Sequence, residues 1–245
     1  IFYESNEGCV YSFEDFVSIL PSSACFLPNE LESLSFWLSA DSLISKDENN
    51  RVSTWGNIAD SEHDAIALSA SNEPLFIHSI QELNNNPVLR FSGDNWMDFG
   101  ELSDIEEVFL LFNHESGTQD NFPPILGHPT LQDFHGEIGS VLFREPNISP
   151  DLISGETRVN GQMVDILTLQ KPTEYIFLNL APTNSVTAKY ITNDKDCCGG
   201  RYWNGDYVEL LFFDTPLSSE ERFQVEQYLR YKYAPPIDLP RRIVV

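Results

Sequence analysis

The sequence predicts an all-β fold with one helix near its C-terminus. Short segments rich in β-branched and aromatic residues recur along the chain, and turns such as Asn84 to Pro87 and Ser92 to Asn95 separate them. Long amphipathic helices between the segments, which would indicate a doubly wound sheet, are missing from the pattern. The spacing is typical of a sandwich or barrel. The expected strands span residues 35–38, 51–55, 88–91, 108–112, 139–143, 175–180 and 207–213.

The predicted helix begins with a capping box. Ser218 is followed three residues later by Glu221, a pairing in which each side chain accepts a hydrogen bond from the other residue's backbone N–H. One helical face then carries, at i, i+3, i+4 and i+7, the residues Val225, Tyr228, Leu229 and Lys232. We expect this face to pack against a sheet and Pro235-Pro236 to stop the helix.

The net charge argues against several partner classes. Lys and Arg total 14 against 38 Asp and Glu in a chain of 245 residues, which gives a formal charge of −24. A field of that sign repels phosphate backbones and anionic lipid, so we expect no nucleic-acid partner. No stretch approaches the ~20 apolar residues that span a bilayer, so no membrane insertion is expected. The carboxylates either keep the protein soluble, which we favour, or hold hard cations such as Ca²⁺.

Three parts are predicted along the chain. Residues 1–33 form an irregular N-terminal lead-in, 34–234 form the folded β domain, and 235–245 are a linker or the start of a following domain. Because the first residue is Ile1 and no basic-then-apolar signal sequence follows it, we expect a mature product or a piece of a longer chain with neighbouring domains.

The four cysteines favour an oxidising compartment. Cys9 and Cys25 can close a loop that anchors the lead-in, whereas the adjacent Cys197 and Cys198 either form a vicinal disulfide or pair elsewhere. None of them shows the Cys-x-x-Cys spacing of a zinc site. A secreted protein is the first interpretation, and a reduced cytosolic chain is the alternative.

Four segments, in order, share patterns with one known superfamily. Phe36 to Ser42 is similar to its "W-L-x-A-D" strand, and Arg51 to Ala65 to its "V-x-x-W-x-D" strand and turn. Pro87 to Gly100 is similar to its "P-x-V-R-F-D-G" hairpin, and Trp203 to Tyr233 to its "F-N-G-D-I-A-E-I" strand and closing helix. The chain therefore resembles the concanavalin A-like lectin/glucanase superfamily, in particular the LamG-like jelly-roll domains of bacterial surface proteins. The resemblance implies a two-sheet antiparallel jelly-roll sandwich in a secreted or cell-surface protein that acts in recognition or adhesion.

The resemblance also indicates where Ca²⁺ would bind. It gathers four carboxylates around the paired central strands, namely Asp94, Asp98, Asp206 and Glu209. Two departures from the family pattern alter such a site: Ser61-Glu62-His63 replaces a glycine-rich turn, and Ser92 replaces an aspartate. The alternative is structural, with Asp94 forming a turn and Glu209 bonding backbone inside the sandwich.

A second candidate metal group lies on one predicted strand. Its members share a strand face at i, i+2 and i+4, and they are Asp133, His135 and Glu137. A solvated strand face is the favoured interpretation, because surface charges far outnumber sites.

Catalysis is not expected. A glycoside hydrolase needs two carboxylates across the scissile bond, and the superfamily's glucanases carry them as "E-x-D-x-x-E" on one strand. The nearest segments, Glu101 to Glu107 and Asp206 to Glu209, lack that spacing. Gly-x-Ser-x-Gly and His-Glu-x-x-His are absent from the sequence. A polysaccharide hydrolase with unrecognised carboxylates is kept as the least favoured alternative.

Glycan recognition needs exposed aromatic rings, because their apolar faces stack on pyranose rings while polar neighbours bind the hydroxyls. Trp96 and Trp203 lie beside polar turns that hold Asn95, Arg201 and Asn204. These five residues are the predicted ligand-binding set. Burial of both tryptophans would instead favour a structural spacer or assembly module of a large extracellular protein.

Overall fold

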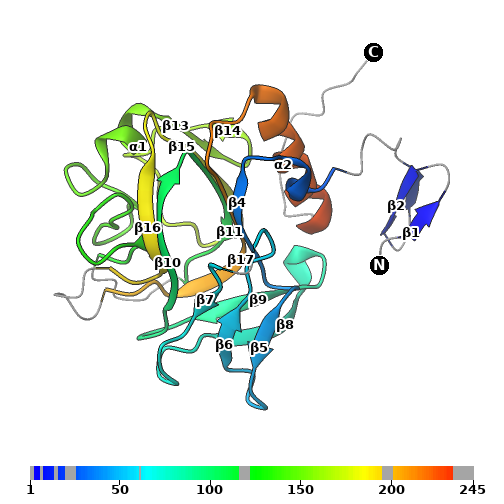
Figure 1. The fold of residues 1–245 in the computed structure, drawn as a ribbon, viewed down its shortest axis with the longest axis horizontal. Coiled ribbons are helices and arrows are strands. Elements are labelled where there is room, and N and C mark those ends of the chain that lie inside the picture. Colours follow the sequence, from blue (N-terminus) through cyan, green and yellow to red (C-terminus); the bar gives the residue numbers. More distant parts are fainter. Residues whose placement is uncertain are drawn as a thin grey trace.

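The computed structural model describes residues 3–5, 8–13, 16–19, 26–60, 62–115, 122–194 and 201–233. Two antiparallel sheets pack face to face, and one long helix covers the outer face of the larger sheet (Figure 1). The predicted all-β, two-sheet antiparallel sandwich with a C-terminal helix is therefore confirmed.

The larger sheet has eight strands in the order β14-β13-β15-β11-β17-β9-β8, with β4 also paired to β17. All nine residues of β17 are buried, because β11 lies along one edge of this strand while β4 and β9 share the other. The strands are β4 (Leu34–Ser39), β8 (Leu75–Ile80), β9 (Asn86–Phe91), β11 (Glu107–Phe112), β13 (Glu156–Val159), β14 (Gln162–Met163), β15 (Ile176–Ala181) and β17 (Gly205–Phe213).

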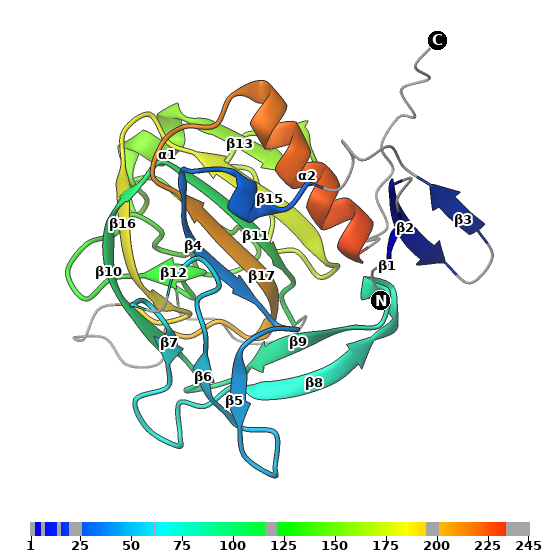
Figure 2. The same cartoon turned by 45° about the vertical axis from the view of Figure 1, so that its right-hand side comes forward.

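The smaller sheet has six strands in the order β12-β16-β10-β7-β6-β5. The β5–β6 turn reaches the larger sheet at β8, where the Phe76 N–H donates to the Asn50 carbonyl over 2.8 Å (Figure 2). The strands are β5 (Ile44–Lys46), β6 (Val52–Trp55), β7 (Ala65–Ile66), β10 (Met97–Ile105), β12 (Leu126–Gly127) and β16 (Val186–Ile191).

Apolar side chains form two clusters, one on each face of the larger sheet. Large aromatic residues fill the space between the sheets, including Phe36, Trp55, Phe91, Phe99, Phe112 and Trp203. The second cluster lies between the outer face of the larger sheet and the helix, and includes Trp37, Phe109, Leu211, Val225 and Leu229. A central strand covered on both faces can be apolar on both, which explains the run Leu210 to Phe213 at the end of β17.

The helix α2 (Ser219–Tyr233) begins as the sequence predicts. The Ser218 N–H donates to Glu221 Oε2 over 2.8 Å, and the Glu221 N–H donates to Ser218 Oγ over 3.3 Å. Val225 and Leu229 are fully buried against the larger sheet, so the predicted helical face is confirmed. Pro235-Pro236 lies outside the described residues.

The predicted strand at 139–143 is wrong. Apart from one isolated bridge between Val141 and Gln170, these residues form a loop. Leu142 and Phe143 are nevertheless fully buried among the side chains between the sheets. The apolar run therefore indicated burial correctly but not strand geometry. A short helix follows, α1 (Pro150–Ser154), with Ser149 as its N-cap.

The lead-in contains regular structure where an irregular segment was expected. β1 (Tyr3–Ser5), β2 (Gly8–Phe13) and β3 (Phe16–Ile19) pair as a separate three-stranded antiparallel sheet. Cys25, Cys197 and Cys198 lie outside the described residues, as do residues 235–245, so the disulfides and the linker stay predictions.

Candidate binding site

The predicted ligand-binding residues come from loops that meet at one end of the sandwich. The Gly93 N–H donates to Asn204 Oδ1 over 2.9 Å, and Thr192 Oγ1 donates to the Asn95 carbonyl over 2.8 Å. These two contacts join three chain segments that are far apart in the sequence. We call them the loop cluster, which consists of residues 92–96, 192–194 and 201–204.

Trp96 is the last residue of its loop before β10, and its side chain lies at the outer face of the smaller sheet. Its ring meets Tyr190 edge-on, with 5.1 Å between the ring centroids, and its side chain is half-buried. Asp98 pairs with Tyr190 across β10 and β16, which places their side chains on the same face of the sheet. Lys189 Nζ lies 3.0 and 2.9 Å from the two carboxylate oxygens of Asp98. We call Trp96, Asp98, Lys189 and Tyr190 the Trp96 face.

Trp203 belongs to the core, which corrects its predicted place on a binding surface. Its side chain is 0% exposed, and its indole N–H donates to the Asn113 carbonyl over 2.9 Å. Phe112 and His114 pack against the ring. Trp203 therefore has no ring face available for stacking on a ligand.

The two predicted asparagines hold the loops together. Asn95 is buried, accepts a hydrogen bond from the Ser92 N–H over 3.1 Å and donates to the Ser71 carbonyl over 3.2 Å. Asn204 accepts from Gly93, as described above. Their amides therefore shape the turn beside Trp96.

The structure separates the four predicted metal ligands, which corrects their expected gathering. Asp98 lies on the smaller sheet, Asp206 and Glu209 lie on β17 of the larger sheet, and Asp94 is an exposed turn residue. Asp206 accepts two hydrogen bonds from Arg90, at 2.7 and 2.8 Å, and one from the Tyr175 hydroxyl at 2.6 Å. Within the described ranges, no group of three or more His, Cys, Asp or Glu side chains is placed to hold a metal ion.

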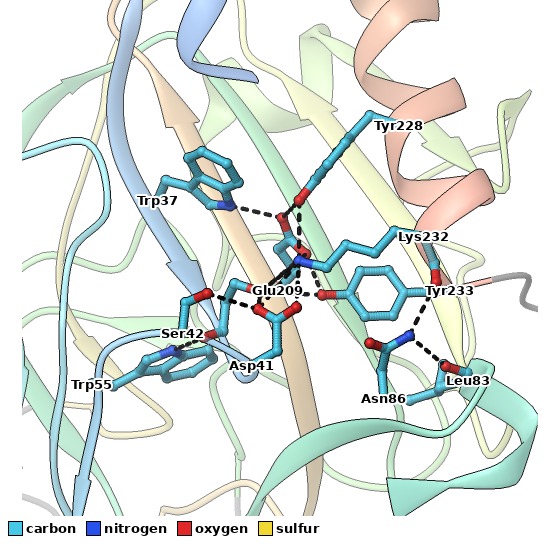
Figure 3. A network of polar contacts seen from close by, with 11 residues as sticks. Trp37, Asp41, Ser42, Trp55, Leu83, Asn86, Glu209, Tyr228, Lys232 and Tyr233 are labelled. Carbon is cyan, nitrogen blue, oxygen red and sulfur yellow. Dashed lines mark hydrogen bonds and ion pairs between the residues drawn. The ribbon is translucent and has the colours of Figure 1, made fainter. Parts of the chain in front are cut away.

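Glu209 lies at the centre of a buried polar network beneath α2 (Figure 3). Trp37 Nε1 donates to its carboxylate over 2.7 Å, and the Tyr228 hydroxyl donates over 2.8 Å. Lys232 Nζ forms an ion pair with it at 2.9 Å, and the Tyr233 hydroxyl donates to the same oxygen. Burial raises the pKa of Tyr233 well above its usual value, and the charge of Glu209 raises it further. Tyr233 therefore remains a hydrogen-bond donor at neutral pH.

Alternation along β17 points this carboxylate at the helix, because Leu211 also lies on the outer face, and a β-bulge precedes Glu209. Leu111 pairs with Glu209 and Phe112 pairs with Tyr207, so Val208 is one extra residue in β17. Val208 packs in the outer cluster, while Tyr207 packs between the sheets. The bulge therefore places Val208 on the outer face next to Glu209 and leaves Tyr207 between the sheets.

A second buried carboxylate attaches the start of the helix. Glu107 is fully buried and accepts from Arg222 Nε over 2.6 Å and from Asn179 Nδ2 over 2.8 Å. The Leu217 N–H also donates to it, over 3.0 Å. Glu107 and Glu209 were the end residues of the two segments considered for catalysis, and the structure shows both bonded to α2 instead.

The triplet Asp133, His135 and Glu137 does not converge on a metal. Asp133 accepts from the Thr187 N–H over 2.8 Å, and Glu137 accepts from the Ile138 N–H over 2.9 Å. His135 instead contacts Asp194 of the loop cluster, with 2.5 Å between His135 Nδ1 and Asp194 Oδ2.

The contact between His135 and Asp194 is buried beneath the loop cluster. Arg201 reaches the same carboxylate, with Nη1 3.4 Å from Asp194 Oδ2. The ring of Phe122 stacks on His135 at 5.5 Å and lies 4.9 Å from the guanidinium of Arg201. The sequence holds no signal for this group, because its members come from four separate places in the chain.

A further polar pair lies on the smaller sheet. His128 Nδ1 accepts from the Leu131 N–H over 3.0 Å, so the ring proton is on Nε2, which donates to Glu101 Oε2 over 2.8 Å. Glu101 belongs to β10, the strand that also carries Asp98. The sheet therefore presents one aromatic ring next to paired polar groups, an arrangement suited to binding a polyhydroxylated ligand.

The chain matches no family model, no curated protein and no solved structure. The interpretation of the site accordingly rests on its geometry and on the chemistry of its residues. Among the described residues, no helix has the length and apolar character needed to cross a membrane.

Proposed function

We propose that the domain is a non-catalytic recognition or adhesion module of a secreted or cell-surface protein, and that it binds glycans through the Trp96 face. The observation that carries the proposal is the position of Trp96, half-buried at the outer face of the smaller sheet beside the Asp98–Lys189 ion pair. An indole ring of this kind can stack on the C–H face of a pyranose, while the adjacent ions bind its hydroxyl groups.

The state of the carboxylates supports a binding role over a catalytic one. Glu107, Asp206 and Glu209 are buried and bonded to basic residues. A general acid needs a proton to transfer and a path to the substrate. A carboxylate in a buried ion pair beneath a helix meets neither requirement. The resemblance to lectin-like jelly-roll domains points to the same class of function.

The test compares glycan binding by the wild-type chain and two variants. Trp96→Ala removes the proposed stacking ring, and Phe223→Ala removes an aromatic ring that is 53% exposed on α2, across the larger sheet from the Trp96 face. A glycan array, run with and without Ca²⁺, identifies a ligand, and titration calorimetry then measures its affinity. We expect Trp96→Ala to abolish binding and Phe223→Ala to retain it.

Two results would contradict the proposal. One is an array on which the wild-type protein binds no glycan above background under either condition. The other is a Trp96→Ala variant that is folded by circular dichroism and binds as tightly as the wild type.

The second candidate is a structural spacer or assembly module of a large extracellular protein. The burial of Trp203 favours it, since the structure leaves one of the two predicted aromatic rings for a ligand. A glycan-negative domain that associates stably with the segments flanking it would support this alternative. A polysaccharide hydrolase remains the least favoured function, and release of reducing sugar from a polysaccharide panel tests it.

A further inference from the structure

Among the residues that the structure describes, three basic side chains on or beside the Trp96 face contact carboxylates of the protein itself. Lys189 is only 25% exposed, and its ammonium group is shared between both oxygens of Asp98. Arg201, at the adjacent loop cluster, contacts Asp194, which also contacts His135. On the same sheet, His128 donates to Glu101. The positive charges of Lys189 and Arg201 are therefore already neutralised by the protein's own carboxylates.

The net charge of the whole chain also disfavours the binding of an acidic ligand. With 38 acidic and 14 Lys or Arg side chains, the protein repels polyanions at distances up to about a Debye length, ~8–10 Å at moderate salt. An anionic sugar would have to overcome this repulsion and then displace Asp98 from Lys189. Like charges brought together at a binding surface reduce affinity strongly.

An uncharged sugar meets no such barrier. The carboxylate of Asp98 has several lone-pair positions, and an ammonium group such as that of Lys189 has three N–H donors. The ion pair can therefore accept from one sugar hydroxyl and donate to another without separating. The ring of Trp96 adds a stacking surface that does not depend on charge.

We propose that the Trp96 face selects uncharged polysaccharides against acidic ones, and that Asp98 determines this selectivity by occupying Lys189. The inference rests on the proposed glycan-binding function and specifies its ligand class. It predicts that removal of the Asp98 charge makes Lys189 available to an acidic ligand.

The experiment uses two forms of one polymer, a soluble neutral β-glucan and its carboxymethylated derivative. Asp98→Asn is the test variant, because the asparagine keeps the Oδ1 acceptor that binds the Gly100 N–H at 2.8 Å. Asp104→Asn is the control, because Asp104 is exposed on the same strand and its replacement changes the net charge equally. Affinities are measured by calorimetry at low and at high salt.

At low salt we expect the wild type to bind the neutral polymer at least about tenfold more tightly than the carboxymethylated one, or ~1.4 kcal/mol. Asp98→Asn should strengthen binding of the carboxymethylated polymer by about tenfold, and high salt should remove that gain. Asp104→Asn should behave as the wild type.

Tighter wild-type binding of the carboxymethylated polymer would overturn the selectivity and leave glycan binding intact. The selectivity role of Asp98 would also be overturned if Asp98→Asn and Asp104→Asn behaved alike. If neither polymer bound and the glycan array were also negative, the proposed function itself would fail, and this inference with it.

Discussion

Replacing Lys232 by Met removes the cation that faces Glu209 beneath α2. The Glu209 carboxylate is fully buried and would keep four neutral donors, from Trp37, Ser39, Tyr228 and Tyr233. Breaking a buried ion pair on one side typically lowers the free energy of unfolding by about 3–5 kcal/mol. Because these neutral donors remain, we expect a loss near ~3 kcal/mol, which lowers the midpoint of thermal unfolding by ~6–12 °C in a domain of this size.

The double variant Glu209→Gln/Lys232→Met separates the charge effect from lost packing. Both variants also leave Asp41, whose side chain is 33% exposed, without its contact to Lys232. Only Lys232→Met leaves the fully buried Glu209 charge without a cation, so the double variant should be more stable than Lys232→Met alone. Arg230→Met, on the same helix, controls for the loss of one positive charge. The assay is equilibrium unfolding in urea, with equal m-values as the check that the unfolding transitions are comparable.

Two outcomes would refute this reasoning. The first is a Lys232→Met variant whose stability is within about 0.5 kcal/mol of the Arg230→Met control, the scatter of ordinary surface changes. The second is a double variant whose loss equals the sum of the two single losses, since additivity means that the charges do not interact.

Three further predictions concern other regions. Excess chelator should leave the unfolding midpoint unchanged, because the predicted metal ligands on the sheets bind Lys or Arg; a drop of several degrees would show a real site. Burial raises the pKa of Glu226, so the contribution of this residue to the free energy of unfolding should be fully present below about pH 4.5 and be lost as the pH rises through its folded-state pKa. Urea unfolding at several pH values tests this, and Glu226→Gln should remove that part of the pH dependence. Gly127→Ala would place a methyl group 1.7 Å from the Asn193 carbonyl oxygen, so it should destabilise the protein and weaken glycan binding together, as measured by calorimetry.

The sequence predicts the central strands well because most of their residues are apolar. β4, β11, β15 and β17 are covered on both faces, and each lies within two residues of its predicted bounds. The capping box likewise identifies the start of α2, since its two hydrogen bonds join residues three positions apart. A local pattern of this kind can be recognised in the sequence because both hydrogen-bonding residues lie within one helical turn.

The strands of the smaller sheet are harder to predict. β10 and β16 carry polar residues on their outer face, and β10 contains irregular pairing with β16. Such segments contain fewer apolar residues than a buried strand, so they resemble the turns that separate strands. The reverse error occurs at 139–143, where an apolar loop fills the core.

The candidate site is predicted in part. Trp96 stands beside polar turn residues in the sequence, and the structure places it at the outer face of the smaller sheet. Trp203 has the same kind of neighbours, yet it closes the end of the core. Both residues lie in loops, Trp96 before β10 and Trp203 before β17, and neighbouring residues in the sequence do not reveal which ring the folded chain buries.

The sequence by itself determined the all-β class, the C-terminal helix and its cap, and the acidic character of the surface, because these depend on composition and on contacts between near neighbours. Only the tertiary structure decided which carboxylate meets which cation. Asp98 meets Lys189 through the pairing of β10 with β16, and Glu209 meets Lys232 because the helix packs on the outer face of β17. A charge that is paired in this way is less available to a metal or an acidic ligand, so the pairing register of distant strands, more than the number of carboxylates, underlies the selectivity that we propose.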